Sequence, residues 1–144
     1  MRLSAKAQYA CVAMLDLACS HGDPNPVHLK HIADKHGISQ RFLVQILMQL
    51  KAAGLVDSTR GATGGYSLAR PPEQINMAEI VHAIDQSPPP APSALSGLYS
   101  TSAVQAISGA LQEAQDREQR ALAEVTLDNL VKQVHQRSEI SYQI

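Results

Sequence analysis

Polar side chains that could contact the edges of nucleic-acid bases are concentrated between Ser39 and Lys51. Apolar residues recur in this stretch with the 3.6-residue period of a helix, which leaves one helix face exposed. That exposed face carries Gln40, Arg41, Val44, Gln45, Gln49 and Lys51. Because glutamine can pair bidentately with adenine and arginine with guanine, this set suits the recognition of a DNA sequence. An ordinary solvated helix surface has a similar composition, so the pattern alone does not distinguish the two.

A second candidate is Arg60, at the base of the glycine-rich segment 59–66 (TRGATGGY). Glycines between two short extended runs predict a hairpin whose backbone is accessible at the tip. An arginine in such a hairpin can enter a narrowed minor groove, where the negative potential of DNA is strongest. The alternative role for Arg60 is an ion pair with Asp57 inside the hairpin.

Two short helices are expected to position the base-contacting face. The first begins near Val27 or His28 and ends at Gly37, where a positive φ costs little for glycine. Ser39 then caps the second helix, with backbone N–H groups nearby that could meet a phosphate, and Gly54 ends it. Helix, turn, helix and basic hairpin in this order predict a winged helix-turn-helix domain, mainly α with a small β-wing.

Further helices are predicted on both sides of this motif in the sequence. Ser4 is a suitable N-cap for a helix that ends near Cys19. The broad apolar face of that helix is expected to comprise Tyr9, Val12, Ala13, Met14 and Leu17. Asn76 and Glu79 form a capping-box pattern, which predicts the start of a fourth helix.

The C-terminal part begins with a change in composition. Residues 87–93 (SPPPAPS) cannot be helical and predict a stiff linker or an exposed loop. A long amphipathic helix is predicted from about residue 101 to residue 124, followed by a short last helix from Thr126. The preceding domain leaves little apolar surface of its own for a helix of this length to cover. We therefore expect it to pair with the same helix of a second subunit in a twofold homodimer; packing against its own domain is the alternative.

These elements divide the chain into three predicted parts. Residues 1–86 form the winged helix-turn-helix DNA-binding domain, residues 87–103 a proline-rich loop, and residues 104–144 the dimerisation helices. Residues 1–70 hold eight Lys and Arg against four Asp, whereas residues 71–144 hold four basic against nine acidic side chains. The basic half coincides with the predicted helix-turn-helix and wing, as phosphate contact requires.

The composition and the amphipathic N-terminal segment indicate a cytoplasmic, nucleoid-associated protein. No apolar run approaches the roughly 18 residues that would span a bilayer. Asp16 interrupts the N-terminal apolar stretch, and the helical spacing continues past it, which favours a core helix over a signal peptide.

The remaining reactive residue types do not form a recognisable site. The histidines at positions 21, 28, 31 and 36 have no cysteine or carboxylate at a spacing that would complete a tetrahedral metal site. Cys11 and Cys19 lie about 12 Å apart along one predicted helix, so they can neither bridge each other nor share a metal. Residues 61–65 (GATGG) lack the Lys-Ser/Thr of a phosphate-binding loop, and no nucleophile is paired with a base. We expect no catalytic residues and no enzyme activity.

The sequence resembles the Rrf-type winged helix-turn-helix transcriptional regulators, the IscR/NsrR-like family. The resemblance rests on MRLSAKAQYACVAMLDLA, on HIADKHGISQRFLVQILMQLKAAGLVDSTRGATGGYSLAR, and on the later segments INMAEIVHAID and VTLDNLV. It covers nearly the whole chain except residues 87–103. The combination of an RGxxGGY wing with an N-terminal MRLSxKxxYA is highly specific.

The resemblance implies a homodimeric bacterial transcription factor that binds double-stranded DNA at a roughly palindromic operator, usually as a repressor. Residue by residue it implies DNA contacts by Ser39, Gln40, Arg41, Phe42 and Gln45, and in the wing by Arg60, Gly61, Gly64 and Gly65. Phe42 is expected to belong more to the core than to a contact with a thymine methyl group.

The sequence departs from the family in the sensor loop. Iron–sulfur members carry three cysteines after the fourth helix, whereas the corresponding QSPPPAPSALSGLYSTSA has none, and Gln8 stands where some members have an acidic ligand. The resemblance thus implies a cluster-less member with no cofactor and no metal. Such a protein answers to an unidentified small-molecule or protein effector, which the proline-rich loop could hold at the dimer junction, or represses without one.

Two alternative functions remain open at this point. The chain could be a thiol-redox sensor that uses Cys11 or Cys19, because both lie in a helix that supports the DNA-binding core. It could also keep the fold, lose operator binding and act as a dimer that regulates another protein.

Overall fold

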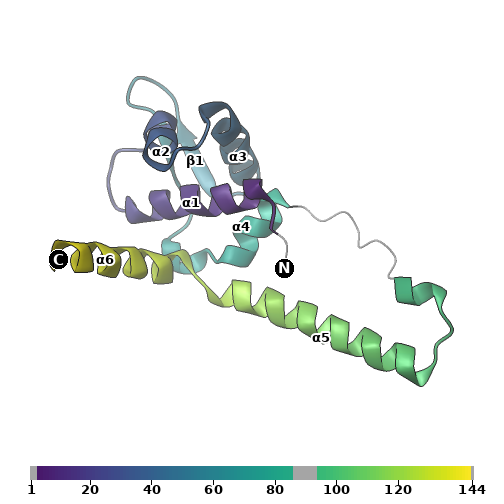
Figure 1. Ribbon diagram of the computed structural model, residues 1–144. Coiled ribbons are helices and arrows are strands. Elements are labelled where there is room, and N and C mark those ends of the chain that lie inside the picture. The colour runs from purple at the N-terminus through teal and green to yellow at the C-terminus, as the bar shows by residue number, and fades with distance from the viewer. Residues whose placement is uncertain (1–2, 86–93, 144) are drawn as a thin grey trace.

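The computed structural model describes residues 3–85 and 94–143 and is mostly helical (Figure 1). The elements follow in the order α1 (Ala5–Cys19), α2 (Leu29–His36), α3 (Gln40–Ala52), β1 (Val56–Thr59), β2 (Gly65–Leu68), α4 (Met77–Ile84), α5 (Ser102–Glu124) and α6 (Leu127–Gln143). Short 3-10 turns, η1 (Pro72–Gln74) and η2 (Ala94–Gly97), precede α4 and α5. This confirms the predicted fold class, mainly α with a small β-wing. The predicted proline-rich segment 87–93 lies outside the described residues.

The predicted helix boundaries follow from local hydrogen bonding. The Ser4 hydroxyl accepts a hydrogen bond from Ala7 N at 3.0 Å, and the Ser39 hydroxyl accepts one from Phe42 N at 3.4 Å. Gly37 ends α2 in the left-handed region, with φ 71°. The capping box at the start of α4 is present on both sides, because Glu79 N donates to Asn76 Oδ1 and Asn76 N donates to Glu79 Oε2.

The wing is an antiparallel hairpin that a third chain segment extends. Val56 pairs with Leu68 and Thr59 with Gly65 across the two strands. Val27, in the loop before α2, exchanges two backbone hydrogen bonds of 2.8 Å with Tyr66. This bridge ties the hairpin to the chain segment that leads into the helix-turn-helix.

The core lies between α1 and the helices on either side of it. Alanines at positions 7, 10 and 13 of α1 are fully buried, which lets α3 and α4 approach that helix closely. The prediction that Tyr9 and Val12 belong to the buried face is wrong, because both side chains are exposed. Val12 lies roughly 140° around the helix from Ala7, on the side away from the core.

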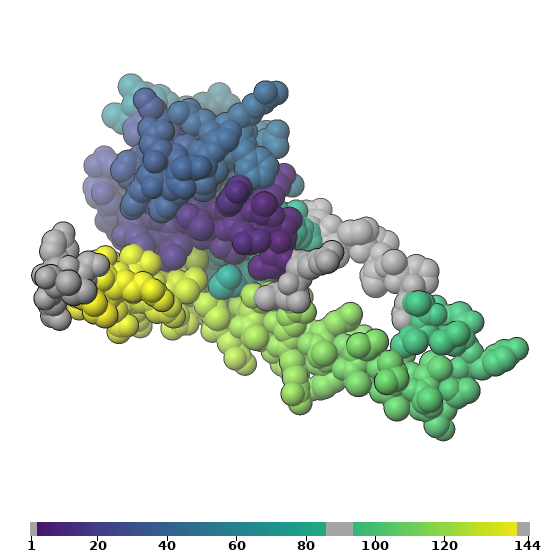
Figure 2. Space-filling view, in the orientation of Figure 1, coloured from purple at the N-terminus to yellow at the C-terminus, as the bar shows by residue number. Residues whose placement is uncertain are grey.

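The C-terminal helices differ in how they meet this core. Leu127, at the start of α6, is fully buried in the same hydrophobic cluster as α1, and its backbone N donates to Ile75 O at 2.9 Å. With 17 residues, α6 is longer than the short helix expected. In contrast, α5 projects beyond the domain as an arm (Figures 1 and 2), and Leu122 is its single buried residue. Among the described residues, no helix has both the length and the apolar character needed to cross a membrane.

Candidate nucleic-acid interface

The two faces of α3 differ sharply in exposure. Leu43, Ile46, Leu47 and Leu50 are fully buried, and they fix how the helix is rotated about its axis. On the other face, the predicted contact residues Gln40, Arg41 and Gln45 are exposed. The centre of the exposed face, by helix geometry, carries Arg41, Gln45 and Met48. Met48 is 63% exposed and was not among the predicted contact residues.

Two residues of α3 that the sequence offered as possible DNA contacts are partly enclosed. Phe42 is half-buried, packs against the hydrophobic core, and meets the Tyr9 ring edge-on at a centroid distance of 5.6 Å. This supports the expectation that Phe42 is mainly a core residue. Gln49 is also half-buried, and its buried side-chain oxygen has no hydrogen-bond partner among the described residues. Gln49 is therefore less available to DNA than the sequence pattern suggested.

The wing presents Arg60 to solvent at the end of β1. Arg60 and Gly61 are exposed, and Gly61 has a φ of 110°, a conformation that favours glycine. Among the described ion pairs there is none between Arg60 and Asp57, so the alternative role considered for Arg60 has no support. Lys51 Nζ donates to Ser58 Oγ at 2.6 Å, which links the end of α3 to β1 and helps to hold the wing beside the helix.

Gly64 and Gly65 have a clear structural reason to be glycine. A Cβ at Gly64 would lie 2.2 Å from Thr59 O, and one at Gly65 would lie 2.4 Å from Val27 O. Both distances are far inside van der Waals contact, and Gly64 is buried. The two residues therefore shape the wing and its contact with the loop before α2. The predicted DNA contacts of these two residues stay predictions.

A buried carboxylate fixes α2 against α1. The Asp16 side chain is 3% exposed, and its Oδ2 lies 2.5 Å from His36 Nε2 and 3.7 Å from Lys35 Nζ. Asp16 is the one buried charged residue among those described, and its two partners come from the last turn of α2. The sequence analysis missed this tie. The available signal was a lone Asp in an otherwise apolar helix face.

The candidate interface lies on one side of the molecule. Figure 1 shows α2, α3 and the hairpin on one side of α1, with α5 and α6 on the opposite side. An extended duplex could therefore approach α3 and the wing without meeting the α5 arm. The space-filling view shows the same arrangement, with α5 and α6 on the side of α1 away from α2 and α3 (Figure 2).

The thiols have little thiolate character near neutral pH. Burial raises the pKa of the Cys11 thiol from its ordinary 9.0 to about 11, and the Asp85 carboxylate adds to this increase. Burial and Asp16 also raise the pKa of Cys19, against a smaller opposing effect of Lys35. Reactive redox cysteines have lowered pKa values, so nothing in these environments favours a thiol-redox sensor.

The donor set of this chain does not fit a cysteine-held iron–sulfur cluster. Such clusters are held mainly by Cys thiolates, usually four, and the sequence contains only Cys11 and Cys19. Cys11 lies midway along α1 and Cys19 is its last residue, so the two are about 12 Å apart along the helix axis. Within the described ranges, no three His, Cys, Asp or Glu side chains are grouped so as to hold a metal ion.

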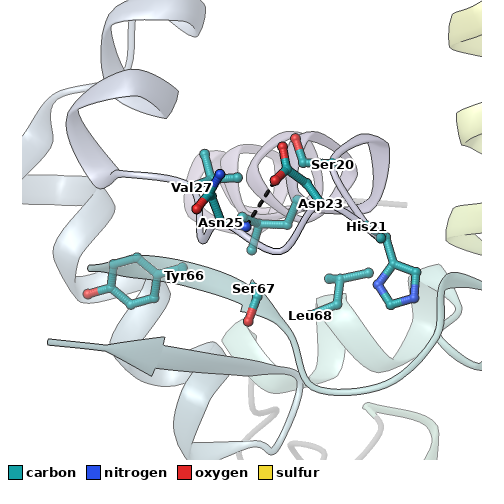
Figure 3. A pocket seen from close by; sticks show the side chains of 10 residues that line it. Ser20, His21, Asp23, Asn25, Val27, Tyr66, Ser67 and Leu68 are labelled. Carbon is teal, nitrogen blue, oxygen red and sulfur yellow. Dashed lines mark hydrogen bonds between the residues drawn. The ribbon is translucent and has the colours of Figure 1, made fainter. Parts of the chain in front are cut away.

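A small pocket lies between the end of α1 and β2 (Figure 3). Its volume is about 40 Å³, and its walls include Leu17, Asn25 and Tyr66. Asn25 N donates to Asp23 Oδ1 at 2.9 Å and closes the turn above it. A space of this size accommodates water, whereas pockets for organic ligands are typically several hundred Å³.

Comparison with known proteins agrees with this geometry. A family model described as "Rrf2: Iron-dependent Transcriptional regulator" matches residues 3–133. The chain is 44% identical over 87 residues to the HTH-type transcriptional regulator IscR of Photorhabdus laumondii, which is 60% of this chain and 52% of that protein. The chain thus spans about half the length of the curated relatives that it matches.

Solved structures are similar over nearly the whole chain. CymR (YrzC), the global cysteine regulator of B. subtilis, has a TM-score of 0.80 and 30% identity, covering 92% of this chain and 97% of its own. The T. potens IscR structure has a TM-score of 0.74 and 32% identity, covering 93% of this chain and 88% of its own.

Proposed function

Since the chain belongs to the Rrf2 family of transcriptional regulators, we propose that it is a sequence-specific DNA-binding repressor that acts as a homodimer at the bacterial nucleoid, in the cytoplasm. The observation that carries this proposal is the exposed polar face of α3 together with the exposed Arg60 of the wing. Arg41 and Gln45 are the proposed base contacts, and Gln40 contributes at the start of the helix. Ser39 and Gly61 offer backbone N–H groups to phosphates.

The wing supplies the second contact in this proposal. Arg60 is fully available to enter the adjacent minor groove, where its charge would meet the strongest negative potential. The neighbouring link between Lys51 and Ser58 keeps β1 close to α3, so the two contacts keep a defined spacing. Gly64 and Gly65 support the shape of the hairpin and make no proposed base contact.

The apolar side of α5 supports a homodimer. Ile107 and Leu111 are 54% and 55% exposed although they lie on the same stripe as Val104 and Ala114. The spacing of this stripe, alternately three and four residues, is typical of helices that pack side by side. The ion pairs from Glu113 to Arg117 and Arg120 lie on the other side of the helix, where they stay solvated. A second copy of α5 would cover the stripe in a twofold arrangement.

A cysteine-held cluster plays no part in the proposed mechanism, because the chain lacks the thiolate donors. We propose that repression responds to another small-molecule or protein effector, or operates without one. The proposed division of the chain is the DNA-binding domain (1–86), the proline-rich loop (87–103) and the dimerisation helices (104–144). Leu127 of α6 also completes the core of the first of these parts.

Selection from random duplexes followed by a salt titration tests this proposal. The wild-type protein should enrich a palindromic sequence, and its affinity should fall linearly on a log–log plot against salt concentration. Arg41→Ala should lose roughly 5- to 150-fold in affinity for that sequence and relax the preference at one base pair. Arg117→Ala, a charge removal on the α5 arm, is the matched control and should bind normally. Failure to enrich any sequence would contradict the proposal.

A further inference from the structure

An apolar strip lies in the middle of the polar recognition face. Met48 is 63% exposed and Val44 is 38% exposed, and the two lie one helical turn apart on the same side of α3. Arg41 and Gln45 border the strip on one side, and Gln40 borders it on the other, by helix geometry. Met48 is the more accessible of the two side chains. Single exposed apolar residues are common on proteins, but this pair lies among the proposed base-contacting side chains of α3.

The major groove offers one apolar group to such a strip. Among the four bases, only thymine presents a methyl group there, at C5, and the other exposed groups are hydrogen-bond donors or acceptors. Methionine suits this contact because its side chain is unbranched and adapts to the shape it meets. Along the helix axis, Met48 lies about 10 Å from Arg41, so the two side chains would contact different base pairs.

We propose that Met48, supported by Val44, determines specificity by contacting a thymine C5-methyl group of the operator. The inference rests on the proposed function, since it assigns a base to the same α3 face. Phe42 is excluded from this role by its packing against the core and the Tyr9 ring.

The surroundings of the strip favour DNA over a second protein as its occupant. Arg41 and Lys51 flank the strip, and the acidic side chains of the chain are concentrated in its C-terminal half. DNA is a polyanion that carries apolar methyl groups, and it is therefore complementary to a basic surface that carries an apolar strip. Helix α5, which a second copy is proposed to cover, lies on the opposite side of α1 from α3 (Figure 1).

Replacing thymine by deoxyuridine tests the contact, because it removes the C5-methyl group and leaves base pairing intact. Each thymine of a selected operator half-site is replaced in turn, and binding is measured by fluorescence anisotropy with the full-length protein. Wild-type affinity should fall about 3- to 10-fold at one position. Met48→Ala should bind the thymine and deoxyuridine forms equally at that position. Met48→Leu, which keeps an apolar side chain, should retain the difference.

The possible results separate this inference from the proposed function. If no operator can be selected, the proposed function fails. If an operator is bound but no deoxyuridine position weakens binding, or if Met48→Ala keeps the same sensitivity, the thymine contact is refuted and the repressor proposal stands. If Met48→Ala instead changes the mass of the protein in solution without DNA, the strip is a protein interface and the inference is overturned.

Discussion

Helices α3 and α5 are both amphipathic, yet they use their apolar sides differently. On α3, four leucine and isoleucine side chains are fully buried against the domain, and the polar side faces solvent. On α5, which is ten residues longer, Leu122 is the single buried residue, and Ile107 and Leu111 remain more than half exposed. An amphipathic pattern therefore predicts that a helix has a partner, but it does not identify that partner. The apolar side of α3 is covered by its own chain, and we propose that the apolar side of α5 is covered by another copy.

Charging the α5 stripe should produce the largest effect. The double variant Ile107→Glu/Leu111→Glu should be monomeric, because two buried carboxylates per subunit would oppose helix pairing. Operator affinity should fall by about 100-fold or more, since two half-sites would no longer be bound together. Sedimentation equilibrium gives the mass, and anisotropy titration gives the affinity.

Ala106→Glu is the matched control for that variant. Ala106 is exposed and lies about 100° around the helix from Ile107, on the side away from the stripe. It should leave both the mass and the affinity unchanged. If the wild-type protein sediments as a monomer, no second copy covers the α5 stripe, and the proposed difference between α3 and α5 is wrong.

Asp16→Ala tests the contact between α1 and α2, which lies within one chain. It removes the carboxylate that contacts His36 and Lys35, so the free energy of unfolding should fall by about 1–3 kcal/mol. This loss should be the same at every protein concentration, because the contact that is removed lies within one subunit. Urea denaturation followed by circular dichroism measures it. Asp34→Ala, an exposed change on α2, should stay within about 0.5 kcal/mol of wild type.

Arg60→Ala should have a moderate effect that is confined to DNA binding. Removing one phosphate or minor-groove contact should weaken binding about 3- to 10-fold across sequences and reduce the salt slope by about one. The free energy of unfolding should not change, because the side chain is exposed and makes no described ion pair. Equal affinity of variant and wild type at low and high salt would remove the wing from the interface.

Replacing Cys11 should produce the smallest of these effects, a change in stability that appears only at alkaline pH. Its pKa is raised from 9.0 to about 11 in the folded protein, so the folded state keeps the proton longer than the unfolded state does. The resulting contribution to stability is complete below about pH 9 and is lost as the pH rises through about 11. Unfolding of wild type and Cys11→Ala, compared at pH 8 and pH 10.5, should show a steeper decline for wild type.

The same pKa predicts slow chemistry at the thiol. Alkylation of Cys11 at pH 8 should be much slower than that of a free thiol, and Cys19, which is exposed, should react faster than Cys11. Rapid oxidation of Cys11 near neutral pH, accompanied by loss of DNA binding, would restore the thiol-redox alternative.

Local elements of the fold were predictable because their signals lie within a few residues. Gly37, Ser39 and the Asn76–Glu79 pair mark helix ends through backbone geometry and capping bonds, and each was found where expected. The wing was also predictable, because glycines between short extended runs favour a hairpin. The candidate base contacts Arg41 and Gln45 followed from the helical period alone.

The residues whose burial or contacts were not predicted correctly from the sequence share a different cause. Tyr9 and Val12 were assigned to the core because an apolar residue in a helix gives no information on which neighbours will cover it. The Asp16–His36 tie joins residues 20 positions apart, and only the packing of α2 on α1 brings them together. The exposure of Met48 and the enclosure of Gln49 likewise depend on how α3 is rotated against its neighbours.

The sequence by itself determined the order of the elements, the ends of the helices and the family, because capping, period and turn chemistry act over short distances along the chain. Only the tertiary structure decided which amphipathic faces are closed within the chain and which remain open, since burial depends on contacts between distant segments. That distinction separates a recognition helix locked on its domain from an α5 arm whose apolar side is left uncovered.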